Sequence, residues 1–86
     1  MEGRLTKRVN PEYPAQARAA RVQGIVVLSV GIGTDGKVID VSVVQGHDLL
    51  NDAAIAAVRQ WEYDPFFLNG QPVEVATQVT LSFQFN

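Results

Sequence analysis

A regular alternation of apolar and polar residues from Val73 to Phe85 constrains the fold of this chain more than any other feature. Polar positions recur at every second residue along most of the segment, so that they share one face of a strand. An apolar face and a polar face on the same strand are typical of an antiparallel sheet that is covered on one side only. The segment therefore predicts a long final strand, with an apolar face formed by Val73, Val75, Val79, Leu81, Phe83 and Phe85.

Two earlier segments rich in β-branched residues predict the other strands, Ile25 to Gly33 and Val38 to Gln45. The turn between them is Thr34-Asp35-Gly36-Lys37, in which glycine supplies a positive φ. The first of these strands is apolar on both faces, which predicts a central position in the sheet. The strand order is then second, first, third, with antiparallel neighbours and the final strand on an edge.

Two helices complete the expected fold. An alanine-rich segment, Ala15 to Val22, predicts a short helix with Gly24 as its C-cap. Apolar residues at spacings of three and four predict a second helix from Leu49 to Gln60, with Asp48 or Asn51 as its N-cap. The predicted class is α+β with element order α-β-β-α-β and a three-stranded antiparallel sheet of order 2-1-3. Both helices are expected on one face of the sheet.

The shared apolar faces predict which residues form the core. Trp61 and Tyr63 are expected to pack where the second helix meets the sheet or the first helix, and Tyr13-Pro14 to pin the entering chain to the body of the domain. The remaining core residues are predicted to be Val26, Leu28, Val30, Ile39, Val41, Ile55, Val58, Val79, Leu81 and Phe83.

A chain of 86 residues forms one small domain. Residues 1–8 lack periodicity and are interpreted as a flexible linker or the remnant of a longer protein, and residues 9–86 as the domain. No apolar run is long enough to span a membrane, and no signal peptide is expected. The net charge is −2 and the chain contains no cysteine, which excludes a disulfide framework and a thiolate metal site.

No pattern predicts catalysis, a metal ion or a cofactor. His47 is the only histidine, and no nucleophile is placed beside it in the sequence. Asp48 and Asp52 lie at a helix start, where the helix dipole accounts for them. Asp35 and Asp40 belong to a hairpin and do not form an acid–base pair. The glycines of the first strand precede another strand rather than a helix, so they do not form a phosphate loop. The chain is therefore expected not to be an enzyme.

Six motifs in order resemble the TonB C-terminal domain family, and together they cover about Val9 to Phe85. The most specific is the pattern Trp-x-Tyr/Phe-x-Pro that follows the second helix. The motifs are Tyr13-Pro14-Ala15-Gln16-Ala17, Gly24, Asp35-Gly36-Lys37-Val38, Leu50 to Val58, Trp61-Glu62-Tyr63-Asp64-Pro65 and Asn69 to Val73, followed by the amphipathic last strand.

The resemblance implies the periplasmic, receptor-binding end of an energy transducer that is anchored in the bacterial inner membrane. Such a domain binds the Ton box, an extended segment of outer-membrane receptors, and couples an ion-driven motor complex to uptake of substrates such as siderophores. An exposed sheet edge can accept this segment as an added strand. The residues expected to bind the partner are Arg8 and Asn10, by analogy with the family, and Val75, Thr77, Val79, Leu81 and Phe83 on the final strand.

Two other functions remain open at this point. The same fold can serve as a peptide-binding or self-association module of another bacterial envelope protein, and two copies can form a homodimer by pairing their final strands.

Nucleic-acid binding is the third hypothesis, because five basic and two acidic residues precede Gly24. The acidic remainder of the chain and the absence of interleaved basic and aromatic residues on the strands disfavour nucleic acid as a partner.

Overall fold

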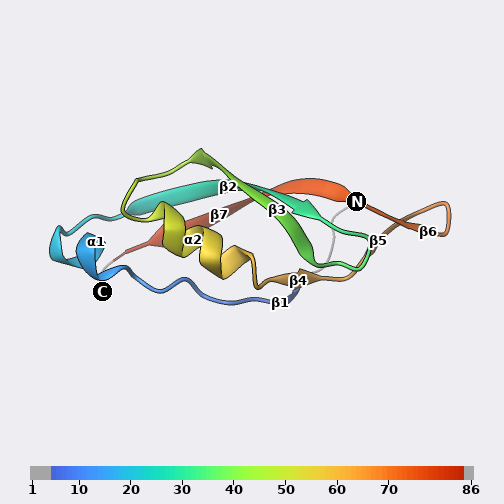
Figure 1. Ribbon diagram of the computed structural model, residues 1–86, viewed down its shortest axis with the longest axis horizontal. Helices are drawn as coiled ribbons and strands as arrows, with labels where there is room; N and C mark the ends of the chain where they lie inside the picture. Colours follow the sequence, from blue (N-terminus) through green and yellow to red (C-terminus); the bar gives the residue numbers. More distant parts are fainter. Residues whose placement is uncertain (1–4, 85–86) are drawn as a thin grey trace.

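The computed structural model describes residues 5–84, and over this range the chain forms two helices and seven strands (Figure 1). Phe85, which the sequence places on the apolar face of the last strand, lies outside the described residues. The elements are β1 (Leu5–Lys7), α1 (Ala15–Ala19), β2 (Gly24–Ile32), β3 (Val38–Gln45), α2 (Asn51–Val58), β4 (Glu62–Tyr63), β5 (Phe66–Leu68), β6 (Gln71–Val73) and β7 (Val75–Phe83).

The three long strands form one antiparallel sheet of order β3-β2-β7. The central strand, β2, is the one whose sequence is apolar on both faces. Its inner face carries Val26, Leu28 and Val30, which are fully buried. The outer face is not covered by a helix, since both helices contribute their buried residues to a single core with these side chains. The chain therefore has the expected α+β architecture.

The buried core agrees with the expected set at most positions. Trp61 is only 4% exposed, and Tyr63 is half-buried against the same cluster. Among the expected residues, Val41, Ile55 and Val79 are half-buried beside the core. Those that are buried are Val26, Leu28, Val30, Val58, Leu81 and Phe83.

Ile39 is the expected core residue that the structure contradicts, because its side chain is 57% exposed. The pairing of β2 with β3 shifts register between Gly31 and Ile32, which pair with Asp40 and Val38. Ile39 is therefore the extra residue of a β-bulge, and it leaves the inner face to Val38 and Val41. A second shift between Val27 and Leu28 similarly interrupts the far end of β3.

Short strands that the sequence did not predict lengthen the molecule. β1 pairs with β4, so residues Leu5–Lys7 belong to a sheet within the segment interpreted as a linker. β5 and β6 form a hairpin through Asn69 and Gly70, whose φ angles of 53° and 79° are those of a type I′ turn. The expected final strand therefore starts later than predicted: Val73 ends β6, Glu74 interrupts the strand, and β7 begins at Val75. Whether residues 1–8 move as a linker stays a prediction.

The helix ends differ from the expected caps. α1 ends at Ala19, and Arg21 then takes a left-handed conformation with φ 57°. The N–H groups of Arg21 and Val22 donate to the carbonyl oxygens of Arg18 and Ala17, at 3.1 and 2.8 Å. This is a Schellman motif, so Arg21 occupies the position that Gly24 was expected to serve.

The start of α2 also departs from the prediction. No side chain caps its N-terminus, where Leu50 is the N-cap. Asp48 is exposed, and the Oδ1 atom of Asn51 accepts a hydrogen bond from the His47 N–H at 2.9 Å. Asn51 thus stabilises the turn before the helix instead of capping its first N–H groups.

Arg21→Gly is expected to raise the free energy of unfolding by about 0.5–1 kcal/mol, because glycine adopts the left-handed region without the penalty of a Cβ atom. The matched control is Ala20→Gly one residue earlier, where the backbone is right-handed with φ −85°. That change should leave stability unchanged or lower it by up to about 1 kcal/mol. Urea denaturation measures both, and a loss of stability in Arg21→Gly would contradict the assigned cap.

Candidate functional site

The free edge of β7 is the first part of the candidate site. Within residues 5–84, β7 lies at the end of its sheet and pairs only with β2. Its nine residues face Gly24–Ile32 one for one, without a register shift. The outward side chains of Gln78, Thr80 and Ser82 are exposed, as the sequence predicted. The edge therefore presents an unbroken, uncharged row of backbone groups on the side away from β2.

The opposite edge of the sheet is unlike β7. Both irregularities of the pairing lie along β3, and each shift twists the strand and interrupts the regular spacing of its N–H and C=O groups. Bulges are a common means by which proteins keep an edge strand from pairing with another chain. Of the two edges, β7 is thus the one whose backbone groups keep the regular spacing that pairing with another strand requires.

The expected partner-binding residues on β7 divide into two groups. Val75, Thr77 and Val79 are half-buried, so part of each side chain is accessible. Leu81 and Phe83 are each 2% exposed and belong to the core. An added strand can reach these last two residues through their main chain but not through their side chains.

Arg8 and Asn10 lie on an extended segment, residues 5–14, that we call the strap. The strap runs along the molecule from β1 to α1 (Figure 1). The indole Nε1–H of Trp61 donates to the Val9 carbonyl oxygen at 2.8 Å. The Arg8 guanidinium lies 5.4 Å from the centre of the Trp61 ring. Arg8 is thereby held over the indole, in the geometry of a cation–π contact.

A second set of contacts ties the ends of the strap to the body of the domain. At one end, the Lys7 Nζ atom lies 3.8 Å from a Glu62 carboxylate oxygen, and the two side chains form an ion pair. At the other end, the Tyr13 hydroxyl donates to the Val22 carbonyl oxygen. The Tyr13 ring meets Phe83 edge to face at 5.6 Å, which joins the strap to β7.

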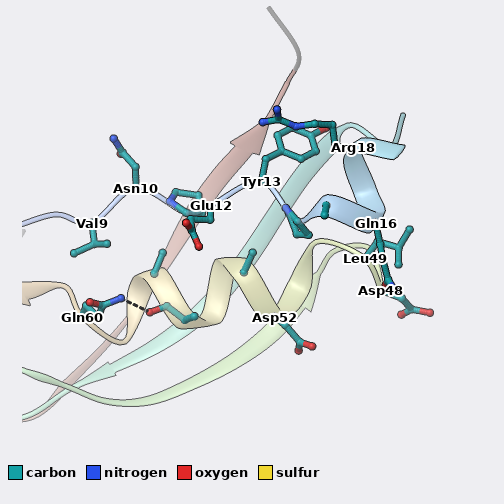
Figure 2. A pocket seen from close by; sticks show the side chains of 16 residues that line it. Val9, Asn10, Glu12, Tyr13, Gln16, Arg18, Asp48, Leu49, Asp52 and Gln60 are labelled. Carbon is teal, nitrogen blue, oxygen red and sulfur yellow. Dashed lines mark hydrogen bonds between the residues drawn. The ribbon is translucent and has the colours of Figure 1, made fainter. Parts of the chain in front are cut away.

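Asn10 lies in a groove between the strap and α2 that has a volume of about 890 Å³. Glu12 extends from the strap toward α2, and Arg18 lies over the Tyr13 ring at 5.7 Å (Figure 2). Small side chains such as Ala53 line the helical wall. The structure therefore separates two of the expected residues, since Asn10 lines this groove whereas Arg8 lies on Trp61.

The sequence reasoning did not single out the groove. Asp48 and Asp52 were interpreted only as helix-start residues, yet both line it together with Glu12. Asp52 lies in the first turn of α2 and Asp48 in the turn before it, so the two carboxylates flank the start of the helix. The approach of Glu12 depends on the long-range path of the strap, for which the sequence carries no signal.

The side chains of His47 and Tyr63 have structural rather than catalytic surroundings. The Nδ1 atom of His47 accepts a hydrogen bond from the Leu49 N–H at 3.0 Å, so it helps to form the turn before α2. Burial raises the pKa of the Tyr63 hydroxyl above its usual value of 10.0. Since the folded state disfavours the phenolate, Tyr63 contributes stability below about pH 10 that is lost as the pH rises further.

The described residues show no metal centre and no membrane-crossing helix. Between residues 5 and 84, no three His, Cys, Asp or Glu side chains are placed to hold a metal ion. Neither of the helices in this range has the length and apolar character needed to cross a membrane.

The fold and its edges define a small α+β domain with one long, regular sheet edge left open. Residues 9–85 match the family model of the Gram-negative bacterial TonB protein C-terminal region. The chain therefore belongs to the TonB C-terminal family, as its motifs indicated.

Curated relatives and a solved structure agree with this assignment. The chain is 36% identical over 84 residues to protein TonB of Xanthomonas campestris pv. campestris, covering 94% of this chain and 38% of the relative. It is 32% identical to protein TonB of Haemophilus ducreyi, covering 95% of this chain and 28% of the relative. The chain thus spans less than half of the length of these relatives.

The fold is shared with a solved structure, the solution NMR structure of the TonB C-terminal domain of Pseudomonas aeruginosa. The TM-score is 0.78, with 21% sequence identity and coverage of 96% of this chain and 86% of that one. The likeness supports the architecture described above.

Proposed function

We propose that this domain is the receptor-binding end of a TonB-type energy transducer and that it binds by strand addition on β7. The partner is the Ton box of an outer-membrane receptor. In this proposal the domain is a binding module rather than an enzyme. It lies in the periplasm, and its parent protein is anchored in the inner membrane and driven there by a motor complex. The observation that carries the proposal is the unbroken nine-residue register of β7 beside a free edge.

Strand addition suits a protein that transmits force. Main-chain hydrogen bonds along an added strand give affinity without requiring particular side chains, so different receptors can share one site. The half-buried side chains of Val75, Thr77 and Val79 add contacts near the start of β7, while Leu81 and Phe83 offer their backbone. The strap, which carries Arg8 and Asn10, reaches the Phe83 end of β7 through the Tyr13 ring contact.

Titration of the ¹⁵N-labelled domain with synthetic receptor N-terminal peptides tests where the partner binds. The largest amide shifts are expected in Val75–Phe83 and around Arg8–Asn10. Shifts that cluster on Ala53–Gln60 would instead assign the peptide to the groove and would contradict strand addition. Sedimentation at several protein concentrations tests whether two copies form a dimer. Adding the peptide should dissociate that dimer if both use the edge of β7.

A second measurement distinguishes strand addition from side-chain docking. N-methylation removes one backbone N–H donor of the peptide at a time. In an added strand only alternate N–H groups face β7, so methylation at every second residue should weaken binding by about tenfold or more, and methylation at the intervening residues should have much less effect. Equal effects at both sets of positions would contradict the proposed mode.

A further inference from the structure

The β5–β6 hairpin projects from the domain as a paired, uncharged arm. It lies at the end of the molecule's long axis, in line with β7 (Figure 1). The residues of the described chain extend over 49 × 21 × 18 Å, so this arm adds to the longest dimension. Its type I′ turn matches the natural twist of the strands, and its residues pair in regular register from Phe66 with Val73 to Leu68 with Gln71.

Two large apolar side chains are exposed on this arm. Leu68 is 63% exposed and Phe67 is 59% exposed, the highest values among the large apolar residues of the described chain. Phe66, by contrast, packs against the core and anchors the base of the arm. Phe67 pairs across the hairpin with Pro72, which makes an apolar surface. Leu68 points to the opposite face of the arm from Phe67, because successive residues of a strand alternate. The face formed by Phe67 and Pro72 is therefore the candidate contact surface.

Charge at the base of the arm limits what that partner can be. No charged residue occurs from Pro65 to Val73, but Asp64 and Glu74 bound the segment on either side and are both exposed. Neither carboxylate forms an ion pair within residues 5–84. Two free carboxylates beside an apolar surface disfavour an anionic membrane and favour a chain that carries a basic residue next to an apolar one.

We propose that the hairpin is a second contact for the same partner chain that pairs with β7, and this inference rests on the proposed function. Only Glu74 separates the hairpin from β7, so a peptide that continues past Val75 runs alongside the arm. Phe67 contacts a large apolar side chain of that continuation, and Asp64 and Glu74 contact a lysine or arginine beside it. The backbone of the turn is already paired, so binding has to order the Phe67 side chain but not the main chain that carries it.

Isothermal titration with two synthetic peptides tests the inference. The short peptide is the receptor segment that binds in the NMR titration. It is truncated at the residue that pairs with Val75, and a spin label on the peptide shows which of its ends lies there. The long peptide continues from there with Ser-Leu-Lys-Ser. The long peptide should bind the unmodified domain about tenfold more tightly than the short one. Phe67→Ser should remove this gain and leave the affinity for the short peptide unchanged. The matched control is Ile39→Ser, which removes an equally exposed apolar side chain from the β3 edge.

Each outcome separates the two proposals. If the short peptide binds β7 but the long one binds no more tightly, the hairpin contact is wrong and the proposed function stands. A gain that survives in Phe67→Ser, or that is lost equally in Ile39→Ser, also overturns the hairpin contact. If no receptor segment binds in the NMR titration, the proposed function fails. Sedimentation with phosphatidylcholine vesicles that depends on Phe67 would assign the arm to lipid and overturn the peptide partner.

Discussion

Gly36→Ala is expected to destabilise the domain by about 3 kcal/mol or more, enough to leave a small domain largely unfolded at moderate temperature. Gly36 has a φ of 86°, and a Cβ atom there would lie 1.9 Å from the Tyr63 carbonyl oxygen. The two backbones are also joined, since the Tyr63 N–H donates to the Gly36 carbonyl oxygen at 2.8 Å. A side chain at this turn would therefore push β4 away from the β2–β3 hairpin.

Gly70→Ala is the matched control, because Gly70 has a similar φ of 79° and no atom lies within 4 Å of the position of an added Cβ. That variant should lose only the cost of placing alanine in a left-handed conformation, about 1–2 kcal/mol. Thermal unfolding followed by circular dichroism measures both variants. A loss in Gly36→Ala no greater than that in Gly70→Ala would mean that the Tyr63 contact does not constrain the fold.

The central elements of the fold could be predicted because their signals are local. A strand that is apolar on both faces predicts the centre of a sheet, and β2 lies there. The Asp35-Gly36 pair predicts a tight turn between two strands, and Gly36 has the expected positive φ. In each case a few adjacent residues determine the structure through steric limits on their own backbone, so no distant contact needs to be known.

Ile39 shows what a local pattern misses. Its period-two position indicates the inner face, but the bulge moves it outward, to where it lies over Gly31 of β2 and Gly33 just after that strand. A Cβ atom on Gly33 would approach an Ile39 methyl group to 3.1 Å. The absence of side chains at Gly31 and Gly33 is therefore what makes room for Ile39. Such an effect arises between strands and is not encoded in the periodicity of β3.

The candidate site divides in the same way. The β7 edge follows from a long alternating segment at the end of the chain, and the sequence predicts it well. The strap and the groove depend on where residues 5–14 pass over α2, which is set by contacts such as Trp61 with Val9, 52 positions apart. The motif containing Trp61 indicated that the residue mattered, but not that it holds this segment.

Trp61→Ala is expected to cost about 3–5 kcal/mol, because it removes a large buried aromatic side chain from the core. Trp61→Phe retains an aromatic ring but loses the indole N–H, so the Val9 carbonyl oxygen loses its donor. This variant is expected to lower the free energy of unfolding by a smaller amount, about 1–2 kcal/mol, and to loosen mainly the strap. Gln60→Ala is a neighbouring control. The Gln60 side chain is exposed, and within residues 5–84 it donates to the Ala56 carbonyl oxygen of the adjacent helix α2, so this variant should change stability by less than about 0.5 kcal/mol.

Amide hydrogen exchange measures where the Trp61→Phe variant loosens. Protection should fall for Leu5–Lys7, which pair with β4 beside Trp61, and remain high in β2 at the centre of the sheet. The same variant should weaken receptor-peptide binding severalfold, because Arg8 and Asn10 lie on the segment that Trp61 holds. If exchange increases equally in the strap and in β2, then Trp61 supports the whole core. If the strap stays protected, the hydrogen bond from Trp61 to Val9 does not hold it in place. Trp61 would then not position Arg8 and Asn10, the strap residues proposed to bind the partner.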